Sequence, residues 1–455
     1  MNIRFLLTAI AILFMQACQK DADNISIQDS KPNLTANYDS KIIDIWTNVY
    51  LTIERDLREF KPTASSRALA YIYMAAYETG RPGMPDFISN QHHLPSLKIP
   101  NLASAITDIN WEAALNTCFA TTLRHFLIKA TPQHLELIDE TERNMSIEFR
   151  DQMFGDVQQN SINWGQNVAN AIINYADTDS AGLHQSTDAY PNSYNIPVGM
   201  GKWRPITPVG RALFPFWGQV RTFAAQKNDL LSPPPYTFSS QANSIYYQQQ
   251  TELYQRSNGL SFDEKWQAEF WSDEIDGLTY SSSGRLFSMA LQMISNENLH
   301  LDESLHLLCK LGIAVNDGAV AAWQSKYYYN TERPQTFIEQ YIDPSFKSNL
   351  GSAIGTQGLM PPCPSYPSIH TTYGGIFQQI FTEFFGANYS FTDKSHLGRT
   401  EFLGEPRTYT SWQQMAEECA NSRILMGVNI KMDCDEGLRL GTAIGRKVLS
   451  YKLKF

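Results

Sequence analysis

The chain has 455 residues and a formal net charge of −10, and 43% of its residues are hydrophobic. This length suffices for several ordinary domains or for one large fold of two fused helical bundles, and the hydrophobic fraction excludes long disorder as the main state. The negative charge, without any block of five or more basic residues, excludes nonspecific nucleic-acid binding, which needs the opposite field. With 26 Gly and 22 Pro, the chain is neither collagen-like nor of low complexity.

Residues 1–17 have the pattern of a secretory signal. Arg4 precedes an apolar run that is too short to cross roughly 30 Å of hydrocarbon, and Ala17 and Cys18 follow it. The pattern resembles a bacterial lipoprotein signal, in which the cysteine is lipidated, although Met15 and Gln16 depart from the usual Leu and small residue. An ordinary signal with an incidental cysteine is the alternative.

This resemblance predicts a lipid anchor at Cys18 and a flexible polar tether over 18–40. No later apolar stretch of about 18 residues is apparent in the sequence, so the lipid is expected to be the only membrane contact. The expected location is the cell envelope, on the periplasmic face or at the cell surface.

Apolar residues recur every three or four positions over most of the remaining chain, which is the spacing of amphipathic helices. No sustained two-residue alternation of the kind that builds a sheet is apparent. We therefore predict an all-α protein with one helical bundle over 41–184 and a second over 243–455. The clearest stripes are Ile42, Trp46, Val49 and Ile53; Trp111, Leu115, Phe119 and Leu123; and Trp164, Val168, Ile172 and Tyr175.

The segment 185–242 differs from both bundles, because Pro, Gly, Ser and aromatic residues dominate it, as in GKWRPITPVGRALFPFWG. It is predicted to be a long ordered connection or the cover of a site. Five cysteines follow Cys18, an odd number without a Cys-x-x-Cys pair, so neither a disulfide framework nor a zinc site is expected and a single bridge stays open. These residues, which are mostly expected in the core, are Cys118, Cys309, Cys363, Cys419 and Cys434.

Three clusters in the second bundle could hold an oxyanion. In KYYYNTERP, Arg333 lies seven positions after Lys326, almost two helical turns, which predicts both cations on one helix face before Pro334 disfavours further helix. An ammonium and a planar guanidinium on one side suit a tetrahedral oxyanion. Two basic residues on a helix usually form only a solvated face.

The second cluster is PPCPSYPSIHTTYGG, in which Pro367 favours a helix start. Ser368, Ile369 and His370 then fall in the first turn, where free backbone N–H groups and the helix dipole attract anions. The alternative is an ordinary helix cap with a solvated histidine.

The third cluster is NSRILMGVNIKMDCDEG, in which Ser422 and Arg423 lead into a predicted helical stretch. Asn429 and Asp433 are four residues apart, which predicts that they share a helix face. An isolated arginine in such a place is usually structural.

Together and in this order, the clusters resemble the signature of the vanadium-dependent haloperoxidase and type-2 phosphatidic acid phosphatase superfamily: Lys-x6-Arg-Pro, Pro-Ser-x-His, then Ser-Arg-x5-His-x3-Asp. The resemblance extends over roughly 40–455 and implies two helical bundles with the oxyanion site in the second. Other segments similar to soluble bacterial haloperoxidase-like proteins are SSRALAYIYMAAYE (65–78), FWSDEIDG (270–277), NDGAVAAWQSKYYYN (316–330) and FTD (391–393).

The resemblance implies a role for each matching residue. Lys326, Arg333 and Arg423 would clamp the oxyanion, with Ser368 and the backbone N–H of Ile369 as further donors. His370 would be the acid or base, its tautomer fixed by a carboxylate that the sequence leaves open between Asp273 and Asp276. Asp433 would orient the nucleophilic histidine.

That histidine is replaced by Asn429. A carboxamide is neither a useful nucleophile nor a good ligand for vanadium, so vanadate is doubtful as a cofactor and phosphate is the expected ligand. His396 is the nearest candidate in sequence to replace the missing imidazole, although a loop histidine is the plainer interpretation.

Three functions remain open. The first is a pocket for a small oxyanion or a phosphorylated small molecule, with covalent chemistry impaired. The second is an active phosphoesterase or peroxidase that uses His370 in a modified mechanism, with phosphoryl transfer favoured over haloperoxidation. The third is a non-catalytic, lipid-anchored binding protein of the envelope.

Overall fold

The computed structural model describes residues 33–455 apart from 152, 207–209 and 274. The predicted signal over 1–17, the lipidation site Cys18 and most of the 18–40 tether lie outside the described residues. Thr35, at the described end of that segment, is fully buried and donates a hydrogen bond to the carbonyl of Gly83 at 3.1 Å. Residues 34–455 form one compact unit.

The first bundle is built from helices whose apolar stripes are buried. In α2, for example, Ile42, Trp46 and Ile53 are all fully buried. Asn110 caps the start of α4 by accepting a hydrogen bond from the N–H of Ala113 at 2.8 Å. The helices are α2 (Lys41–Asp56), α3 (Thr63–Gly80), α4 (Trp111–Phe126), α5 (Pro132–Arg150), α6 (Val157–Asp177) and α7 (Ser180–Thr187).

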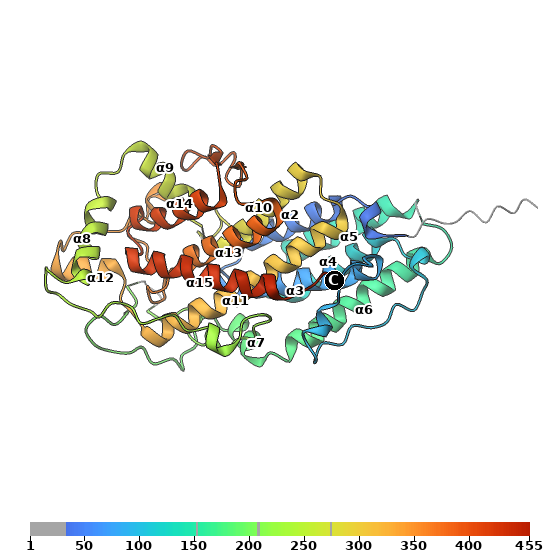
Figure 1. Ribbon diagram of the computed structural model, residues 1–455, viewed down its shortest axis with the longest axis horizontal. Coiled ribbons are helices and arrows are strands. Elements are labelled where there is room, and N and C mark those ends of the chain that lie inside the picture. Colours follow the sequence, from blue (N-terminus) through green and yellow to red (C-terminus); the bar gives the residue numbers. More distant parts are fainter. Residues whose placement is uncertain (1–32, 152, 207–209, 274) are drawn as a thin grey trace, which may run out of the picture. The chain divides into compact units, whose positions relative to one another are not determined.

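The second bundle is organised around α11 (Leu301–Tyr329), which packs against α3 of the first bundle and against α13 and α15 of the second. Figure 1 shows α11, α13 and α15 running alongside one another. The other helices are α8 (Ile245–Ser257), α9 (Phe262–Phe270), α10 (Ser282–Glu297), α12 (Pro334–Tyr341), α13 (Ile369–Phe385), α14 (Trp412–Leu425) and α15 (Lys431–Ser450).

By length and composition α11 could cross a membrane, contrary to the expectation that no such stretch follows residue 18. Within its most apolar 18-residue window, however, 94% of the helix is buried inside the protein. This burial is the character of a core helix, because a membrane-spanning helix would present an apolar surface to lipid.

Regular β-structure in the described residues is limited to two short strands. Strand β1 (Phe391–Asp393) pairs antiparallel with β2 (Arg407–Tyr409), and Phe391 lies opposite Tyr409. The predicted all-α class is therefore confirmed. Short 3-10 helices, η1 to η7, cover Thr35–Asn37, Arg81–Gly83, Asn90–His92, Ile106–Asp108, Trp217–Gln219, Lys227–Asp229 and Ser352–Ile354.

The described parts of the irregular segment 185–242 are attached to α11. The buried carboxylate of Asp317 accepts hydrogen bonds of 2.8–2.9 Å from three successive backbone N–H groups, those of Phe223, Ala224 and Ala225. The N–H of Leu213 donates to the carbonyl of Pro362 at 2.9 Å. The Asp317 contacts hold the segment against α11, the helix that carries Lys326, and the Leu213 contact ties it to the stretch before α13.

Helices α13 and α15 approach so closely that only glycine fits at their crossing. A Cβ on Gly375 would lie 2.4 Å from the carbonyl oxygen of Leu438 and 2.6 Å from the backbone nitrogen of Thr442. A Cβ on the preceding Gly374 would lie 3.3 Å from the flexible end of the Leu438 side chain and 3.9 Å from Ala416, an ordinary contact distance. The N-terminus of α13 is therefore set by backbone packing against α15.

We expect Gly375→Ala to lower the free energy of unfolding by about 1–3 kcal/mol, because the added methyl group forces the two backbones apart. Gly374→Ala is the matched control and should leave stability unchanged or raise it by up to about 1 kcal/mol, since Ala is the better helix former. Urea denaturation of both variants measures the difference. Equal effects would contradict the close crossing.

The five cysteines of the described chain are free and buried. This agrees with the expectation of small core residues and shows no disulfide framework among the described residues. No group of histidine, cysteine and carboxylate side chains in residues 33–455, as described, could hold a metal ion.

Candidate oxyanion site

The corner between α11 and α12 carries the first two cations. Lys326 lies in the last turn of α11, which ends where Asn330 adopts a left-handed conformation with φ of 52°. Arg333 lies just before α12, with Pro334 at the first helical position. The prediction that both cations share one helix face was therefore wrong. The chain turns between them and brings both side chains to one cavity.

The N-terminus of α13 carries the second cluster, as the sequence predicts. Ser368 immediately precedes the helix, and Ile369 and His370 are its first residues. The N–H of Ser368 donates to the carbonyl of Asp433 at 2.9 Å, which ties this helix start to α15. Ser368 is 1% exposed, and its hydroxyl makes no hydrogen bond within the described chain. Unlike Ile369 and His370, Ser368 is not among the residues that line the cavity described below.

The junction of α14 and α15 carries the third cluster. Arg423 lies in the last turn of α14, and Gly427, with φ of +76°, turns the chain towards α15. Asn429 precedes α15, whereas Asp433 is its third residue, so the prediction of a shared helix face was wrong. The two side chains meet nonetheless, because Asn429 Nδ2 donates to Asp433 Oδ2 at 3.2 Å.

These three junctions converge on one cavity of about 400 Å³. Its lining includes the three predicted cations, and leucine, isoleucine, methionine and proline side chains make up much of the rest. Lys61, Tyr190 and Leu213 contribute from outside the second bundle. The complete lining is Glu59, Lys61, Pro62, Tyr190, Leu213, Asp273, Ile275, Asp276, Trp323, Lys326, Arg333, Leu350, Ile354, Leu359, Met360, Pro361, Pro362, Cys363, Ile369, His370, Arg423 and Asn429.

Each of the three cations donates at least one hydrogen bond to a backbone carbonyl. Lys326 Nζ donates to the carbonyls of Pro364 and Ser365, each at 2.9 Å. Arg423 Nη1 donates to the carbonyl of Trp271 at 2.7 Å. Lys326, Arg333 and Arg423 are each only 1–3% exposed, so their charges act in a medium of low dielectric constant.

Arg333 has a different set of contacts. Its Nε donates to the carbonyl of Cys363 at 2.8 Å, its Nη1 to the carbonyl of Val428 at 3.2 Å, and its Nη2 to Cys363 Sγ at 3.1 Å. None of these groups is a carboxylate.

His370 is 8% exposed, and its Nε2 makes no hydrogen bond within the described chain. Burial, and next the positive charge of Arg423, hold the pKa of His370 well below its usual value, although Asp273 opposes the shift. The imidazole is therefore neutral near pH 7 and can act first as a base.

The carboxylates proposed to accompany His370 differ in environment. Asp276 is half exposed and lies 3.5 Å from Lys61 Nζ. Asp273 is buried, its Oδ1 lies 3.3 Å from Arg285 Nη1, and its Oδ2 has no hydrogen-bond partner in the described chain. Burial acts to raise the pKa of Asp273, but Arg285 and His396 outweigh it and the pKa is lowered. Asp273 is thus the ionised group that acts electrostatically on His370.

His396 lies beside Asp273 and Arg285 and does not line the cavity. Its Nε2 lies 2.9 Å from Arg285 Nη1 and 3.6 Å from Asp273 Oδ1, and its ring stacks on Tyr280. Arg285 also donates to Asp393, at 2.8 Å, in the FTD segment. The sequence-based possibility that His396 replaces the missing imidazole has no support in this arrangement.

Asn429 lines the cavity, and its amide nitrogen is engaged by groups of the protein. Nδ2 lies 3.1 Å from both the carbonyl and the hydroxyl oxygen of Ser365, and 3.2 Å from Asp433 Oδ2. Ser365 Oγ donates to the same Asp433 oxygen at 2.6 Å. Because a carbonyl and a carboxylate can only accept, they fix the amide nitrogen towards these groups.

Cys363, Trp323 and Lys61 line the cavity, and sequence reasoning missed all three as site residues. Cys363 lies between prolines in the PPCPSYPSIH stretch, five residues before Ser368. That proximity was an available signal, but a buried cysteine is usually a core residue and was interpreted as one.

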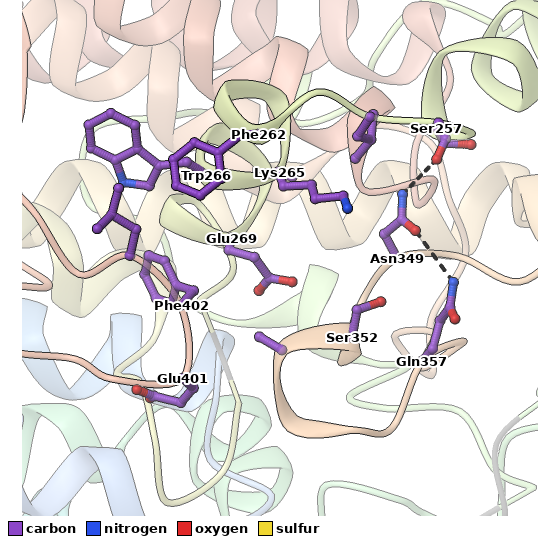
Figure 2. A pocket seen from close by; sticks show the side chains of 15 residues that line it. Ser257, Phe262, Lys265, Trp266, Glu269, Asn349, Ser352, Gln357, Glu401 and Phe402 are labelled. Carbon is purple, nitrogen blue, oxygen red and sulfur yellow. Dashed lines mark hydrogen bonds between the residues drawn. The ribbon is translucent and has the colours of Figure 1, made fainter.

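A second cavity, of about 510 Å³, lies beside α9, and none of the predicted site residues is in its described lining. Figure 2 shows Trp266, Lys265 and Glu269 on one side and Asn349 with Gln357 on another. Burial raises the pKa of Glu269 to about 7. With two glutamates, Glu269 and Glu401, and a single lysine in its described lining, this cavity lacks the cation cluster that an oxyanion requires.

The comparisons with known proteins agree with this geometry. Residues 306–455, which carry all three clusters, match the family model of the VCPO second helical-bundle domain. By this match, residues 306–455 belong to the vanadium haloperoxidase superfamily. Among the curated proteins that were compared, none matches this chain.

Solved structures of bacterial vanadium haloperoxidases share the fold. A bacterial vanadium-dependent iodoperoxidase superimposes with a TM-score of 0.80 at 23% identity, covering 92% of this chain and 98% of its own. The holo form of a bacterial vanadium-dependent chloroperoxidase gives 0.67 at 14% identity, with 88% and 93% covered. An apo form gives 0.62 at 15%, with 87% and 95% covered. The predicted superfamily and its helical-bundle fold are confirmed.

Proposed function

We propose that the cavity binds a tetrahedral oxyanion, either phosphate or vanadate, or the phosphoryl group of a small molecule. The observation that carries the proposal is the convergence of Lys326, Arg333 and Arg423 with His370 on one buried cavity. Fixed positive charges in a medium of low dielectric constant favour an anion over water. The unpartnered His370 Nε2 would supply a further hydrogen bond.

Vanadate, the group that the superfamily implies, fits this site only in part. The cations and donors suit its oxygens. At position 429, however, the chain offers an amide whose nitrogen faces Ser365 and Asp433 rather than an imidazole. An amide nitrogen is a poor metal ligand, since its lone pair is delocalised into the carbonyl. Vanadate is therefore proposed as a ligand held through its oxygens.

The same replacement impairs the covalent chemistry that the family pattern assigns to a histidine. Loss of a covalent nucleophile costs several orders of magnitude in rate in well-studied enzymes. Electrostatic stabilisation by the remaining cations would leave the site able to bind, and to accelerate weakly, a reaction at phosphorus.

Titration calorimetry with phosphate and with vanadate at low ionic strength tests the proposal. We expect binding that weakens as salt is added, because the attraction is electrostatic. Arg423→Ala should weaken it by about 2 kcal/mol, roughly 30-fold, through loss of a charge-assisted hydrogen bond. The matched control is Arg446→Ala, which changes an exposed arginine of α15. No binding at millimolar ligand would refute the proposal.

A second candidate is an active phosphoesterase, favoured by the neutral His370 with an unpartnered Nε2 on the cavity wall. Water would attack phosphorus while His370 moves the proton. Hydrolysis of phosphomonoesters that is lost in His370→Ala would support this candidate. The predicted lipid anchor at Cys18 and the envelope location are further parts of the proposal, and labelling with a radioactive fatty acid would test them.

A further inference from the structure

The guanidinium of Arg333 has an unusual partner. Arg333 is 3% exposed, and the three groups that accept its hydrogen bonds are two backbone carbonyls and Cys363 Sγ. A buried guanidinium without an opposite charge is costly. Of these three acceptors, only the sulfur can become an anion. At 3.1 Å from Cys363 Sγ, the guanidinium of Arg333 would therefore stabilise a thiolate at this position.

Cys363 also lies where a nucleophile is needed. It lines the same cavity as His370, Arg423 and Asn429. The side chain is held by a rigid stretch, since prolines stand on both sides of it and its own carbonyl accepts from Arg333 Nε at 2.8 Å. Independent of the cysteine, the buried and unpartnered Nε2 of His370 indicates that this cavity receives a polar ligand.

We propose that Cys363 is the nucleophile of this site and attacks the phosphorus of a phosphate monoester bound among the cations, in place of the histidine that Asn429 replaces. The inference rests on the proposed oxyanion binding and extends it to a reaction and a substrate class. Thiolates are strong nucleophiles, and a neighbouring cation is a common means of stabilising them.

The two steps balance without an oxidant or a reductant. The thiol proton passes through solvent to the neutral His370, the sulfur forms a bond to phosphorus, and the ester P–O bond breaks. His370 returns the proton to the leaving alkoxide, which departs as an alcohol. Water then attacks the phosphorus and the S–P bond breaks. Phosphate leaves, and a proton from water restores the thiol.

The test uses the full chain with p-nitrophenyl phosphate. Mass spectrometry of peptides after an alkaline quench should find one phosphoryl group on Cys363, and Cys363→Ser should lower kcat at least about 100-fold. The serine variant keeps a side chain of similar size, so phosphate binding by calorimetry should change less than about threefold. Cys118→Ala, which changes a fully buried cysteine of α4 outside the cavity, is the control.

The results distinguish a failure of the Cys363 proposal from a failure of the proposed oxyanion binding. A wild-type protein that binds phosphate but never carries a phosphoryl group on Cys363 would overturn this inference and leave the oxyanion site intact. Undiminished kcat in Cys363→Ser would do the same. A wild-type protein that does not bind phosphate would refute the proposed function itself. Thermal denaturation of each variant establishes that it is folded.

Discussion

Replacing Asn429 with histidine is expected to create covalent chemistry at this site. Asn Nδ2 and His Nδ1 are bonded to the same side-chain carbon, so a histidine Nδ1–H can donate to Asp433 as the amide does now. Its Nε2 would then extend further from the backbone. Asn429 already lines the cavity, which gives the larger ring space to occupy.

The expected gain is on the order of 10³-fold or more in the rate of phosphoenzyme formation, because an imidazole is a competent nucleophile and an amide is not. The substitution should be made in a Cys363→Ala background, so that any trapped phosphoryl group can be assigned to position 429. Peptide mass spectrometry after incubation with p-nitrophenyl phosphate measures it. Peroxide-dependent iodide oxidation, with and without added vanadate, measures the other chemistry of the superfamily.

Asn429→Gln is the matched control, since it lengthens the side chain and keeps the amide. It should show neither activity. A folded Asn429→His protein that binds phosphate and yet forms no phosphohistidine and oxidises no iodide would show that more than the imidazole is missing.

The convergence of the cations could be predicted from sequence because it depends on the order of three motifs. Lys326, Arg333, His370, Arg423 and Asn429 all reach the same cavity. The local geometry could not be predicted in the same way. The spacing of Lys326 and Arg333 fits one helix, but Asn330 in the left-handed conformation ends α11 between them. The spacing of Asn429 and Asp433 fits one helix as well, although α15 begins only at Lys431.

Other features depended on contacts between distant segments, which no local pattern reports. Sequence left Asp273 and Asp276 as equal candidates. In the structure, Asp273 is buried and contacts Arg285 and His396, whereas Asp276 is half exposed beside Lys61. These distant contacts identify Asp273 as the carboxylate that acts on His370. Cys363 lies near Ser368 in sequence, but that proximity alone does not separate a site residue from a core cysteine. The hydrogen bond from Arg333 to Cys363 Sγ, which the structure shows, makes that distinction.

Sulfate binding is expected to strengthen as the pH falls, with a limiting slope of about tenfold per pH unit for the uptake of one proton. In the free protein, burial and Arg423 hold the pKa of His370 well below 6.5, so the imidazole is neutral. Three further charged residues act on the His370 imidazole: Asp273 raises its pKa, whereas Arg285 and Lys326 lower it. A bound dianion adds negative charge beside the ring and raises that pKa.

The sign follows from proton uptake. Between the lowered pKa of the free protein and the higher pKa of the complex, binding takes up one proton, and an equilibrium that takes up a proton shifts towards the complex as pH falls. Sulfate is the right probe because its own charge stays constant over this range, which phosphate's does not. Calorimetric titrations at several pH values, in buffers of different ionisation enthalpy, measure both the affinity and the proton uptake.

His370→Gln should remove most of the pH dependence and the proton uptake, and leave the binding that the cations provide. His306→Gln is the matched control, since His306 is a half-buried histidine whose pKa is lowered, to about 3, but it does not line the oxyanion cavity. It should leave the slope unchanged. A slope that survives in His370→Gln would assign the proton to another group of the site, for which Asp433, whose pKa is raised by burial, is the next candidate.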